Sequence, residues 1–457
     1  MNPIVTRAAP KEREVEAFRA RRQRVLDALL AQNGEGILVL PTGSEIPSHG
    51  DGSFPFRPGS DFDYLCGFPE PDAILVVFPE TRRSRTTARA ELFVRPKDKT
   101  AEVWHGRRFG EKAARRAFGV DEAKTLAQFD ERLLELLDDF DRLFVRYRAD
   151  QRFDDRLFRL FGQRSKRHRR RSIAAHPALI DPTPAIARER LVKDEVELDA
   201  LRLAAEVSCA GHRAAMAEAA PGHYEFEIQA ALESEFRRRG SSRNGYESIV
   251  ASGANACILH YVENRRRTKS GDLVLLDAGA EVGGLTADIT RTWPVTGSFT
   301  DAQLSVYKAV LKAQRAAIRA VRPGRSYAQV HATAARALTR GLVDLGVLRG
   351  DPKKLFKTNA FRPFYMHGTG HYLGRDVHDV GAYEDEKGRP IPLEPGMVLT
   401  IEPGLYFDSK DQGVPAQLRG IGVRIEDDIL VTEDGCEVLT AAVPTDPKAI
   451  EAVCRGE

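Results

Sequence analysis

The feature that most restricts the fold of this chain is a set of acidic and imidazole side chains inside apolar segments of its second half. These side chains belong to Asp277, Asp288, His371, Glu402 and Glu426. A buried carboxylate without a partner is very costly, so four of them cannot gather unpaired. Either these residues lie apart or cations neutralise them. Two divalent metals that share carboxylates would also make a hydrolytic site.

The first two aspartates flank a turn signal. Asp277 ends the apolar run 273–277, and Asp288 follows Gly283 and Gly284. Two strands joined by a turn through these glycines would place both carboxylates at one end of a sheet. Without a metal the two charges would repel, and one group would have to stay protonated. Taken alone, the pair favours the simpler interpretation of two turn aspartates.

Histidines are concentrated in the segment that follows. His367, His371 and His378 fall within twelve residues of a chain that has 11 histidines. Gly368 and Gly370 allow the backbone to approach a ligand or metal closely. A single histidine is more often a satisfied core residue, so it is the trio that favours function. The pattern does not indicate which ring binds metal.

The two glutamates close the pattern. Glu402 ends an apolar strand before Pro403 and Gly404, which are also a plain turn signal. By strand alternation Arg424 and Glu426 share a face, which fits either a surface ion pair or an arginine that supports a metal-binding carboxylate. Each signal is weak alone, but the order Asp, Asp, His, Glu, Glu with these flanks is far more specific.

Length, net charge, cysteine content and the absence of long apolar runs argue against several classes of protein. The 457 residues predict two or three domains, and the net charge of +3 implies no polyanionic partner. Five scattered cysteines without a Cys-x-x-Cys pair argue against a disulfide framework and fit a reducing compartment. The N-terminus lacks the apolar core of a signal peptide, and no apolar run approaches the roughly 18 residues that span a bilayer. We expect a cytoplasmic protein without membrane or nucleic-acid partners.

The chain divides by pattern into two halves. Strand-like runs that alternate with helical segments predict an α/β domain over residues 1–185. A basic run at 163–171 precedes the boundary. It could bind nucleic acid, but a solvated surface segment is the favoured interpretation. Long helices with little strict alternation predict an α+β domain over residues 186–457, with helices near 225–239, from Thr300, and near 327–345.

Whole motifs of the chain resemble the pita-bread metallopeptidase superfamily, and within it the Xaa-Pro aminopeptidases (aminopeptidase P). The similar motifs of the second half are Ile258-Leu-His-Tyr261, Asp277-Ala-Gly279, Asp288-Ile-Thr-Arg-Thr292, His367-Gly-Thr-Gly-His371, Asp376-Val-His-Asp379, Glu402-Pro-Gly-Leu-Tyr406 and 420–428. Phe54-Pro-Phe-Arg57 and Glu102-Val-Trp104 resemble the family's N-terminal domain. The resemblance implies a pita-bread catalytic domain after an N-terminal α/β domain that shapes the cleft edge and supplies oligomer contacts.

The resemblance also implies an activity and a metal set. The chain would release the N-terminal residue from peptides with proline in the second position. Asp277 would ligate one metal, Asp288 and Glu426 would bridge two, and His371 and Glu402 would bind the second. Manganese is the expected metal, and cobalt, zinc and iron also suit such ligands.

Further roles follow from the same resemblance. Glu402 would shuttle protons, and His260 and His378 would stabilise the scissile carbonyl and the developing oxyanion. The remaining substrate-binding residues would be His367, Tyr406 and Arg424 at the proline, and Asp51, Trp104 and Arg389 at the small end of the cleft. The chain is expected to form a homo-oligomer, a dimer or a tetramer.

Three alternatives remain at this point. A prolidase would perform the same chemistry on dipeptides, and Arg389 could bind their terminal carboxylate. A metal-free binding protein on the same fold typically loses ligands, whereas this chain has all five. A creatinase-like hydrolase is less favoured, because creatinases lack the metal set.

Overall fold

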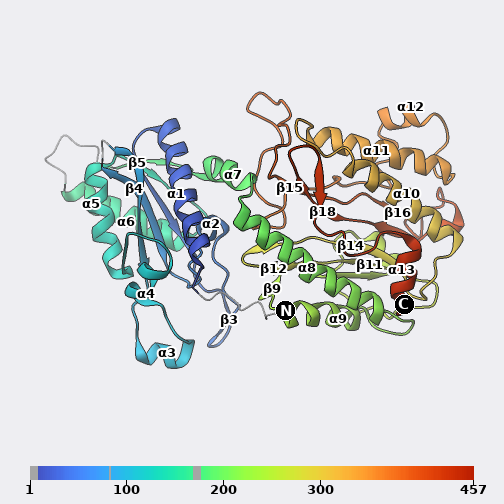
Figure 1. The fold of residues 1–457 in the computed structure, drawn as a ribbon, viewed down its shortest axis with the longest axis horizontal. Coiled ribbons are helices and arrows are strands. Elements are labelled where there is room, and N and C mark those ends of the chain that lie inside the picture. The colour runs from blue at the N-terminus through green and yellow to red at the C-terminus, as the bar shows by residue number, and fades with distance from the viewer. Residues whose placement is uncertain (1–8, 82–83, 168–175) are drawn as a thin grey trace. The chain divides into compact units, whose positions relative to one another are not determined.

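The computed structural model describes residues 9–81, 84–167 and 176–457. The chain divides into two compact units, and the division falls between Arg190 and Leu191. The boundary predicted from sequence lay near residue 185. Each unit is described separately below (Figure 1).

The N-terminal unit contains one six-stranded sheet, with strand order β6-β5-β4-β1-β7-β8, and a small two-stranded ribbon, β2-β3. Its strands are β1 (Ile37–Pro41), β2 (Pro47–His49), β3 (Gly52–Ser53), β4 (Ile74–Thr81), β5 (Ser84–Val94), β6 (Glu122–Thr125), β7 (Arg142–Phe144) and β8 (Ala178–Ile180). Its helices are α1 (Glu12–Asn33), α2 (Ser60–Cys66), α3 (Lys99–His105), α4 (Gly110–Ala117), α5 (Phe129–Asp139), α6 (Gln151–Arg167) and α7 (Thr183–Leu191).

The central strand β1 is apolar throughout because both of its faces are covered. Leu38 and Leu40 belong to the hydrophobic cluster that includes residues of α1, α2 and α4. Ile37 and Val39 point to the opposite side and pack with leucines of α5 and α6. Helices therefore lie on both faces of the sheet, which is the α/β arrangement predicted from the strand-like runs (Figure 1).

The basic run of residues 163–171 differs from its predicted character at Arg164. This side chain is only 3% exposed, and its guanidinium donates to the carbonyl oxygen of Leu137 at 2.7 Å. The prediction of a solvated segment is wrong for this residue, because α6 continues through it and turns it toward α5. Arg169, Arg170 and Arg171 lie outside the described residues.

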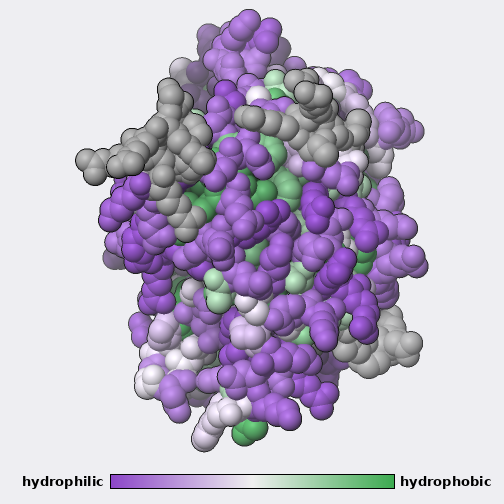
Figure 2. Space-filling view, turned by 90° about the vertical axis from the view of Figure 1, so that its left-hand side faces the viewer, coloured by the Kyte–Doolittle hydropathy of each residue, from purple (hydrophilic) through white to green (hydrophobic). Residues whose placement is uncertain are grey.

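The face shown in Figure 2 is mostly hydrophilic, with a limited hydrophobic area in its upper half.

The C-terminal unit combines long helices with small antiparallel sheets. Its helices are α8 (Glu195–Glu218), α9 (Glu225–Arg238), α10 (Asp301–Ile318), α11 (Tyr327–Asp344), α12 (Pro352–Lys357) and α13 (Pro447–Cys454). Its strands are β9 (Arg243–Asn244), β10 (Ile249–Ser252), β11 (Leu273–Asp277), β12 (Ala280–Val282), β13 (Leu285–Thr286), β14 (Thr290–Pro294), β15 (Val398–Ile401), β16 (Gly404–Tyr406), β17 (Gly422–Arg424), β18 (Asp427–Val431) and β19 (Cys436–Val438). The predicted α+β class is confirmed.

Helix caps explain where the long helices begin. The Asp194 side chain accepts hydrogen bonds from the first turn of α8. Thr300 and Ser326 each form a capping box, with Gln303 at the start of α10 and Gln329 at the start of α11. None of the helices within the described ranges combines the length and the apolar character that a membrane span requires.

The sheets place the acidic residues at breaks in strands. β11 pairs with β14 so that Asp277 lies opposite Thr290, and β15 pairs with β18 so that Ile401 lies opposite Asp427. Strand structure stops between Thr286 and Thr290, and again between Arg424 and Asp427. The interruptions leave Asp288 before β14 and Glu426 between β17 and β18. Both carboxylates are thereby freed from the regular side-chain alternation of a strand.

Candidate metal centre

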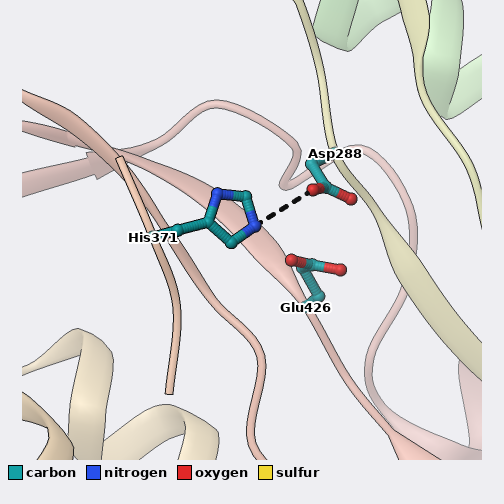
Figure 3. Close-up of side chains that lie close together, drawn as sticks. All are labelled: Asp288, His371 and Glu426. Atoms are coloured by element: carbon teal, nitrogen blue, oxygen red, sulfur yellow. Dashed lines mark ion pairs between the residues drawn. The ribbon is translucent and has the colours of Figure 1, made fainter. Parts of the chain in front are cut away.

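Three of the five predicted residues converge on one point in the C-terminal unit. One ligand atom from each of Asp288, His371 and Glu426 lies within 4.8 Å of the others, and Figure 3 shows the three side chains facing one another. His371 Nε2 is 3.4 Å from Asp288 Oδ2. Both carboxylates are buried, and the imidazole is partly exposed. Carboxylate oxygens with one imidazole form a donor set that suits first-row divalent metals.

Tyr246 joins Asp277 to Asp288. Its hydroxyl lies 2.6 Å from Asp277 Oδ1 and also contacts Asp288 Oδ1. The predicted side-by-side placement of the two aspartates is therefore observed. The hairpin through Gly283 and Gly284 does not itself join their strands, since it links β12 to β13 in a separate sheet.

The segment that contains His371 is hydrogen-bonded to the strand that leads to Glu402. The amide of Thr400 donates to His371 O at 2.8 Å, and the amide of Glu402 donates to Thr369 O at 2.7 Å. A Cβ on Gly370 would lie 1.8 Å from the carbonyl oxygen of Thr400, so only glycine fits there. This close approach places His371 Nε2 3.9 Å from Glu402 Oε1.

The orientation of the His371 ring follows from its own backbone contact. Nδ1 lies 3.1 Å from the carbonyl oxygen of Tyr372. A carbonyl can only accept, so in the neutral ring Nδ1 carries the proton and Nε2 offers a lone pair. Nε2 is the nitrogen that faces Asp288, as metal ligation requires.

Arg424 connects the acidic cluster to its aromatic neighbours. Its guanidinium donates to Asp277 Oδ2 at 2.6 Å, to Thr290 Oγ1 at 3.1 Å and to the Tyr406 hydroxyl at 3.2 Å. Thr290 in turn donates to Glu426 Oε2 at 2.7 Å. Arg424 is only 3% exposed, so the interpretation of a surface ion pair is wrong.

A second chain of hydrogen bonds fixes His367. Its Nδ1 lies 2.7 Å from Gly368 O, so Nδ1 is the protonated nitrogen, and Nε2 accepts from the Tyr406 hydroxyl at 2.8 Å. Burial, together with the charge of Arg424, lowers the pKa of His367 to about 3. The ring is therefore neutral near pH 7 and presents an aromatic face beside Tyr365, with ring centroids 5.0 Å apart.

The electrostatics of the cluster favour a cation. Burial, followed by the charge of Asp277, raises the pKa of Asp288 well above its usual range. Burial and the charge of Asp288 raise the pKa of Glu426 likewise, and burial and the charge of Glu426 raise the pKa of Glu402 to about 8. Protons alone could relieve this repulsion only by removing ligand charges. A divalent cation relieves it with the ligands ionised, so these residues fit the metal that the donor set implies.

Two further predicted histidines lie beside this cluster. The ring of His378 packs on that of His371 with centroids 4.1 Å apart. His260 is exposed, and it lies close enough to His378 to contribute to the lowering of the His378 pKa, after burial and His371. A fully buried ion pair, Lys193 Nζ to Asp379 Oδ2 at 2.8 Å, ties down the loop that contains His378.

The remaining predicted residues are not brought to the cluster by any described contact. Arg389 is exposed and pairs with Asp385 at 2.6 Å on the same turn. Asp51 and Trp104 belong to the N-terminal unit, where Asp51 is exposed in the turn between β2 and β3 and Trp104 is 78% exposed on α3.

Sequence reasoning missed two residues that hold the site together. Tyr246 bonds carboxylates 31 and 42 positions further along the chain, and no local pattern marks it. Arg291 is fully buried. It donates to the carbonyls of Glu426 and Val443 and to Asp427 Oδ1. Its place between two threonines in a strand gave no sign of these partners.

Comparisons with known proteins agree with this geometry. Residues 199–433 match metallopeptidase family M24, and residues 18–144 match the N-terminal domain of aminopeptidase P. The Xaa-Pro aminopeptidase of Escherichia coli (strain K12) is 41% identical over 438 residues, which cover 96% of this chain and 97% of that protein. Mouse Xaa-Pro aminopeptidase 3 is 35% identical over 95% of this chain and 85% of its own length.

Solved structures show the same fold. A zinc-substituted E. coli aminopeptidase P in complex with product has a TM-score of 0.91 at 40% identity, over 97% of this chain and 98% of that chain. An aminopeptidase of Pseudomonas aeruginosa has a TM-score of 0.92 at 39% identity, over 99% of this chain and 100% of that chain. The predicted pita-bread fold is confirmed. The chain therefore belongs to metallopeptidase family M24 and contains an aminopeptidase P type N-terminal domain.

Proposed function

We propose that this protein is an Xaa-Pro aminopeptidase that uses two divalent metal ions, with manganese as the preferred metal. The observation that supports it most is the buried acidic cluster around His371, whose pKa shifts favour a bound cation, in a chain 41% identical to an Xaa-Pro aminopeptidase over nearly its whole length. Asp277, Asp288, His371, Glu402 and Glu426 would hold the metals. Divalent cations in such a site lower the pKa of water and polarise a carbonyl.

Glu402 is the proposed proton carrier. Its carboxylate lies 3.9 Å from His371 Nε2, beside the position proposed for the metals, where a carboxylate can take a proton from water and pass it on. It takes a proton from the attacking water and delivers one to the departing proline nitrogen, because an amine leaves poorly unless it is protonated. His260 and His378 stabilise the negative charge that develops on the scissile carbonyl oxygen.

The proline side of the substrate is assigned to His367, Tyr406 and Arg424. The Arg424–Tyr406–His367 chain of hydrogen bonds holds the His367 ring in a fixed orientation. A neutral, oriented imidazole beside Tyr365 offers a flat surface for the pyrrolidine ring without an unpaired charge. Asp51, Trp104 and Arg389 are proposed to limit the small end of the cleft.

Substrate length distinguishes this activity from that of a prolidase. The manganese-loaded protein should release the first residue from an Xaa-Pro-Xaa tripeptide and leave a matched Xaa-Ala-Xaa tripeptide uncut. An Xaa-Pro dipeptide should be a poor substrate. Arg389, the candidate for binding a terminal carboxylate, already pairs with Asp385. Cleavage of the dipeptide alone would overturn the proposal in favour of a prolidase.

We also propose that the protein forms a homo-oligomer and is cytoplasmic. α3 has no buried residue, and its Val103 and Trp104 are 81% and 78% exposed, so we expect this helix to contact another copy in a homo-oligomer. All five cysteines are free thiols, which fits a reducing cytoplasm. Light scattering checks the first point: a strictly monomeric protein at micromolar concentration would contradict it.

A further inference from the structure

The segment 369–373 runs alongside β15 on one side, and among the described residues no second strand pairs with its other side. On its inner side, the His371 carbonyl accepts from Thr400 in β15, and the Leu373 amide donates to Val398 O at 3.0 Å. The Thr369 carbonyl accepts from the amide of Glu402, just after β15. In an extended strand, alternate residues turn their backbone groups to opposite sides. Gly370 and Tyr372 therefore present theirs away from β15, and such groups need partners when they are shielded from water.

The Tyr372 carbonyl accepts from the Asp379 amide at 2.9 Å, and tyrosine hydroxyls supply partners to the other outward groups. The Tyr327 hydroxyl donates to Gly370 O at 2.6 Å and accepts from Gly370 N at 3.0 Å, so one phenol satisfies both backbone groups of the residue before His371. The Tyr372 amide donates to the Tyr383 hydroxyl at 3.2 Å. The Tyr327 and Tyr383 rings pack together with centroids 4.8 Å apart.

The same helix fixes the neighbouring residue. Tyr327 is the first residue of α11, and His331 lies one turn further along the same face. His331 Nδ1 is 2.8 Å from the hydroxyl of Thr369, which also lies 2.6 Å from the Tyr365 hydroxyl. Thr369 is fully buried. The capping box at Ser326 fixes where α11 starts. It therefore also fixes the position of Tyr327 along the segment 369–373.

We propose that Tyr327 is a positioning residue for the metal centre, which acts by clamping Gly370 so that His371 stays aligned with Asp288 and Glu426. The proposal rests on the function proposed above. His371 and Glu402 depend on one register between the segment and β15, and Tyr327 bonds both outward backbone groups of Gly370, the residue before His371. Loss of its hydroxyl leaves a backbone donor and acceptor unsatisfied and loosens the segment.

The test is removal of one hydroxyl in the full-length protein, with a matched control. Tyr327→Phe deletes the clamp. Tyr307→Phe deletes another buried phenol of the same unit, which donates to Thr445 O at 3.0 Å. Metal-free protein is titrated with Mn²⁺ alone, and backbone hydrogen exchange of the 368–372 region is measured without metal. A milder variant, Tyr383→Phe, keeps the test valid if Tyr327→Phe does not fold.

Tyr327→Phe should weaken Mn²⁺ binding by about 10-fold and lower kcat at saturating Mn²⁺ with KM unchanged, since partners behind metal ligands typically change affinity by that order. It should also speed exchange of the 368–372 amides, and Tyr383→Phe should give smaller shifts in the same direction. Tyr307→Phe should leave Mn²⁺ affinity and these amides unchanged. Parental Mn²⁺ affinity in Tyr327→Phe, or equal losses in Tyr307→Phe, overturns the proposal.

The hydrogen-exchange measurement distinguishes a failure of this inference from a failure of the proposed function on which it rests. A parent protein that binds no Mn²⁺ refutes the proposed function. In that event faster exchange in Tyr327→Phe alone still supports the clamp, and unchanged exchange overturns it.

Discussion

Two glutamates, one in each unit, are buried to nearly the same degree and held in opposite ways. Glu91 of the N-terminal unit is 1% exposed, and Glu426 of the C-terminal unit is 2% exposed. Arg132 donates to both oxygens of Glu91, at 2.8 and 3.0 Å, and Lys124 Nζ lies 2.7 Å from one of them. Burial alone would raise the pKa of Glu91, but these hydrogen bonds outweigh burial and lower it.

Glu426 has different surroundings. A neutral hydroxyl, that of Thr290, donates to it, and its charged neighbours include Asp288 and Asp277. Burial and these like charges raise its pKa well above the usual range. The comparison separates two uses of a buried acid. One carries its own cations and stabilises the fold, whereas the other is incomplete until a cation arrives from solution.

The largest effect is expected from Glu402→Ala. The change removes the proposed proton carrier and a proposed metal ligand together, so kcat on a proline tripeptide should fall by about 10³-fold or more. Thermal unfolding should show an intact fold, because the raised pKa of Glu402 means that the fold does not favour its charge. Glu437→Ala, at an exposed surface pair with Arg202, is the control and should keep full activity. Unchanged turnover in Glu402→Ala would refute its role.

Glu91→Gln should lower stability and leave activity unchanged, the opposite of the pattern expected for Glu402→Ala. The free energy of unfolding should fall by about 2 kcal/mol, since Arg132 and Lys124 lose the charge that they bond, and kcat of the folded enzyme should not change. Urea titration measures the loss. Glu135→Gln removes only the charge of Glu135, the 57% exposed partner of Arg132. The free energy of unfolding should fall by less than about 0.5 kcal/mol. Equal losses in the two variants would mean that burial of the pair contributes nothing.

Glu426→Gln sharpens the comparison through the sign of its effect. In metal-free protein it replaces a carboxyl group whose charged form burial and Asp288 disfavour, so stability at pH 8 should equal or exceed that of the parent. Mn²⁺ affinity should fall in the same variant. Urea titration with and without Mn²⁺ measures both. A metal-free variant that is less stable than its parent would show that the Glu426 charge is already neutralised within the fold.

The pH dependence of the metal-free protein tests the same like-charge repulsion without a substitution. Asp288, Glu402 and Glu426 have pKa values raised above the roughly 3.9 to 4.3 of unfolded carboxyl groups, so the folded state binds more protons between about pH 4 and 8. These groups therefore contribute their whole stabilisation below about pH 4, and this contribution is lost as pH rises toward about 8. Saturating Mn²⁺ should flatten this decline, as unfolding midpoints at several pH values can show. Identical slopes with and without Mn²⁺ would contradict the account.

Local sequence patterns predicted much of this site because its donors stand at recognisable places. Asp277 ends an apolar strand, Glu402 precedes Pro-Gly, and the glycines around His371 permit the close approach to Thr400 that the structure shows. The predicted start of a helix at Thr300 likewise agrees with the capping box that opens α10. Each of these signals is contained within a few residues, so the chain reveals it without its fold.

The supporting residues could not be predicted, because their partners are distant in sequence. Tyr246 is recognisable only once β11 and the residues before β14 lie together. Tyr327 meets Gly370 across 43 positions, and Arg291 meets Glu426 across 135. The strand breaks at Asp288 and Glu426 were also missed, since regular alternation continues through both positions in the sequence. Tertiary pairing, not local propensity, decided where those strands end.

The most direct test of the central claim is the number of divalent ions bound per chain. Metal-free protein is dialysed against Mn²⁺, freed of excess metal and measured by elemental analysis, with Glu91→Gln and Glu426→Gln in parallel. The account predicts two ions per chain in the parent and in Glu91→Gln, and fewer in Glu426→Gln. Fewer than about one ion per chain in the parent would contradict it, because the buried acids would then be satisfied without a metal.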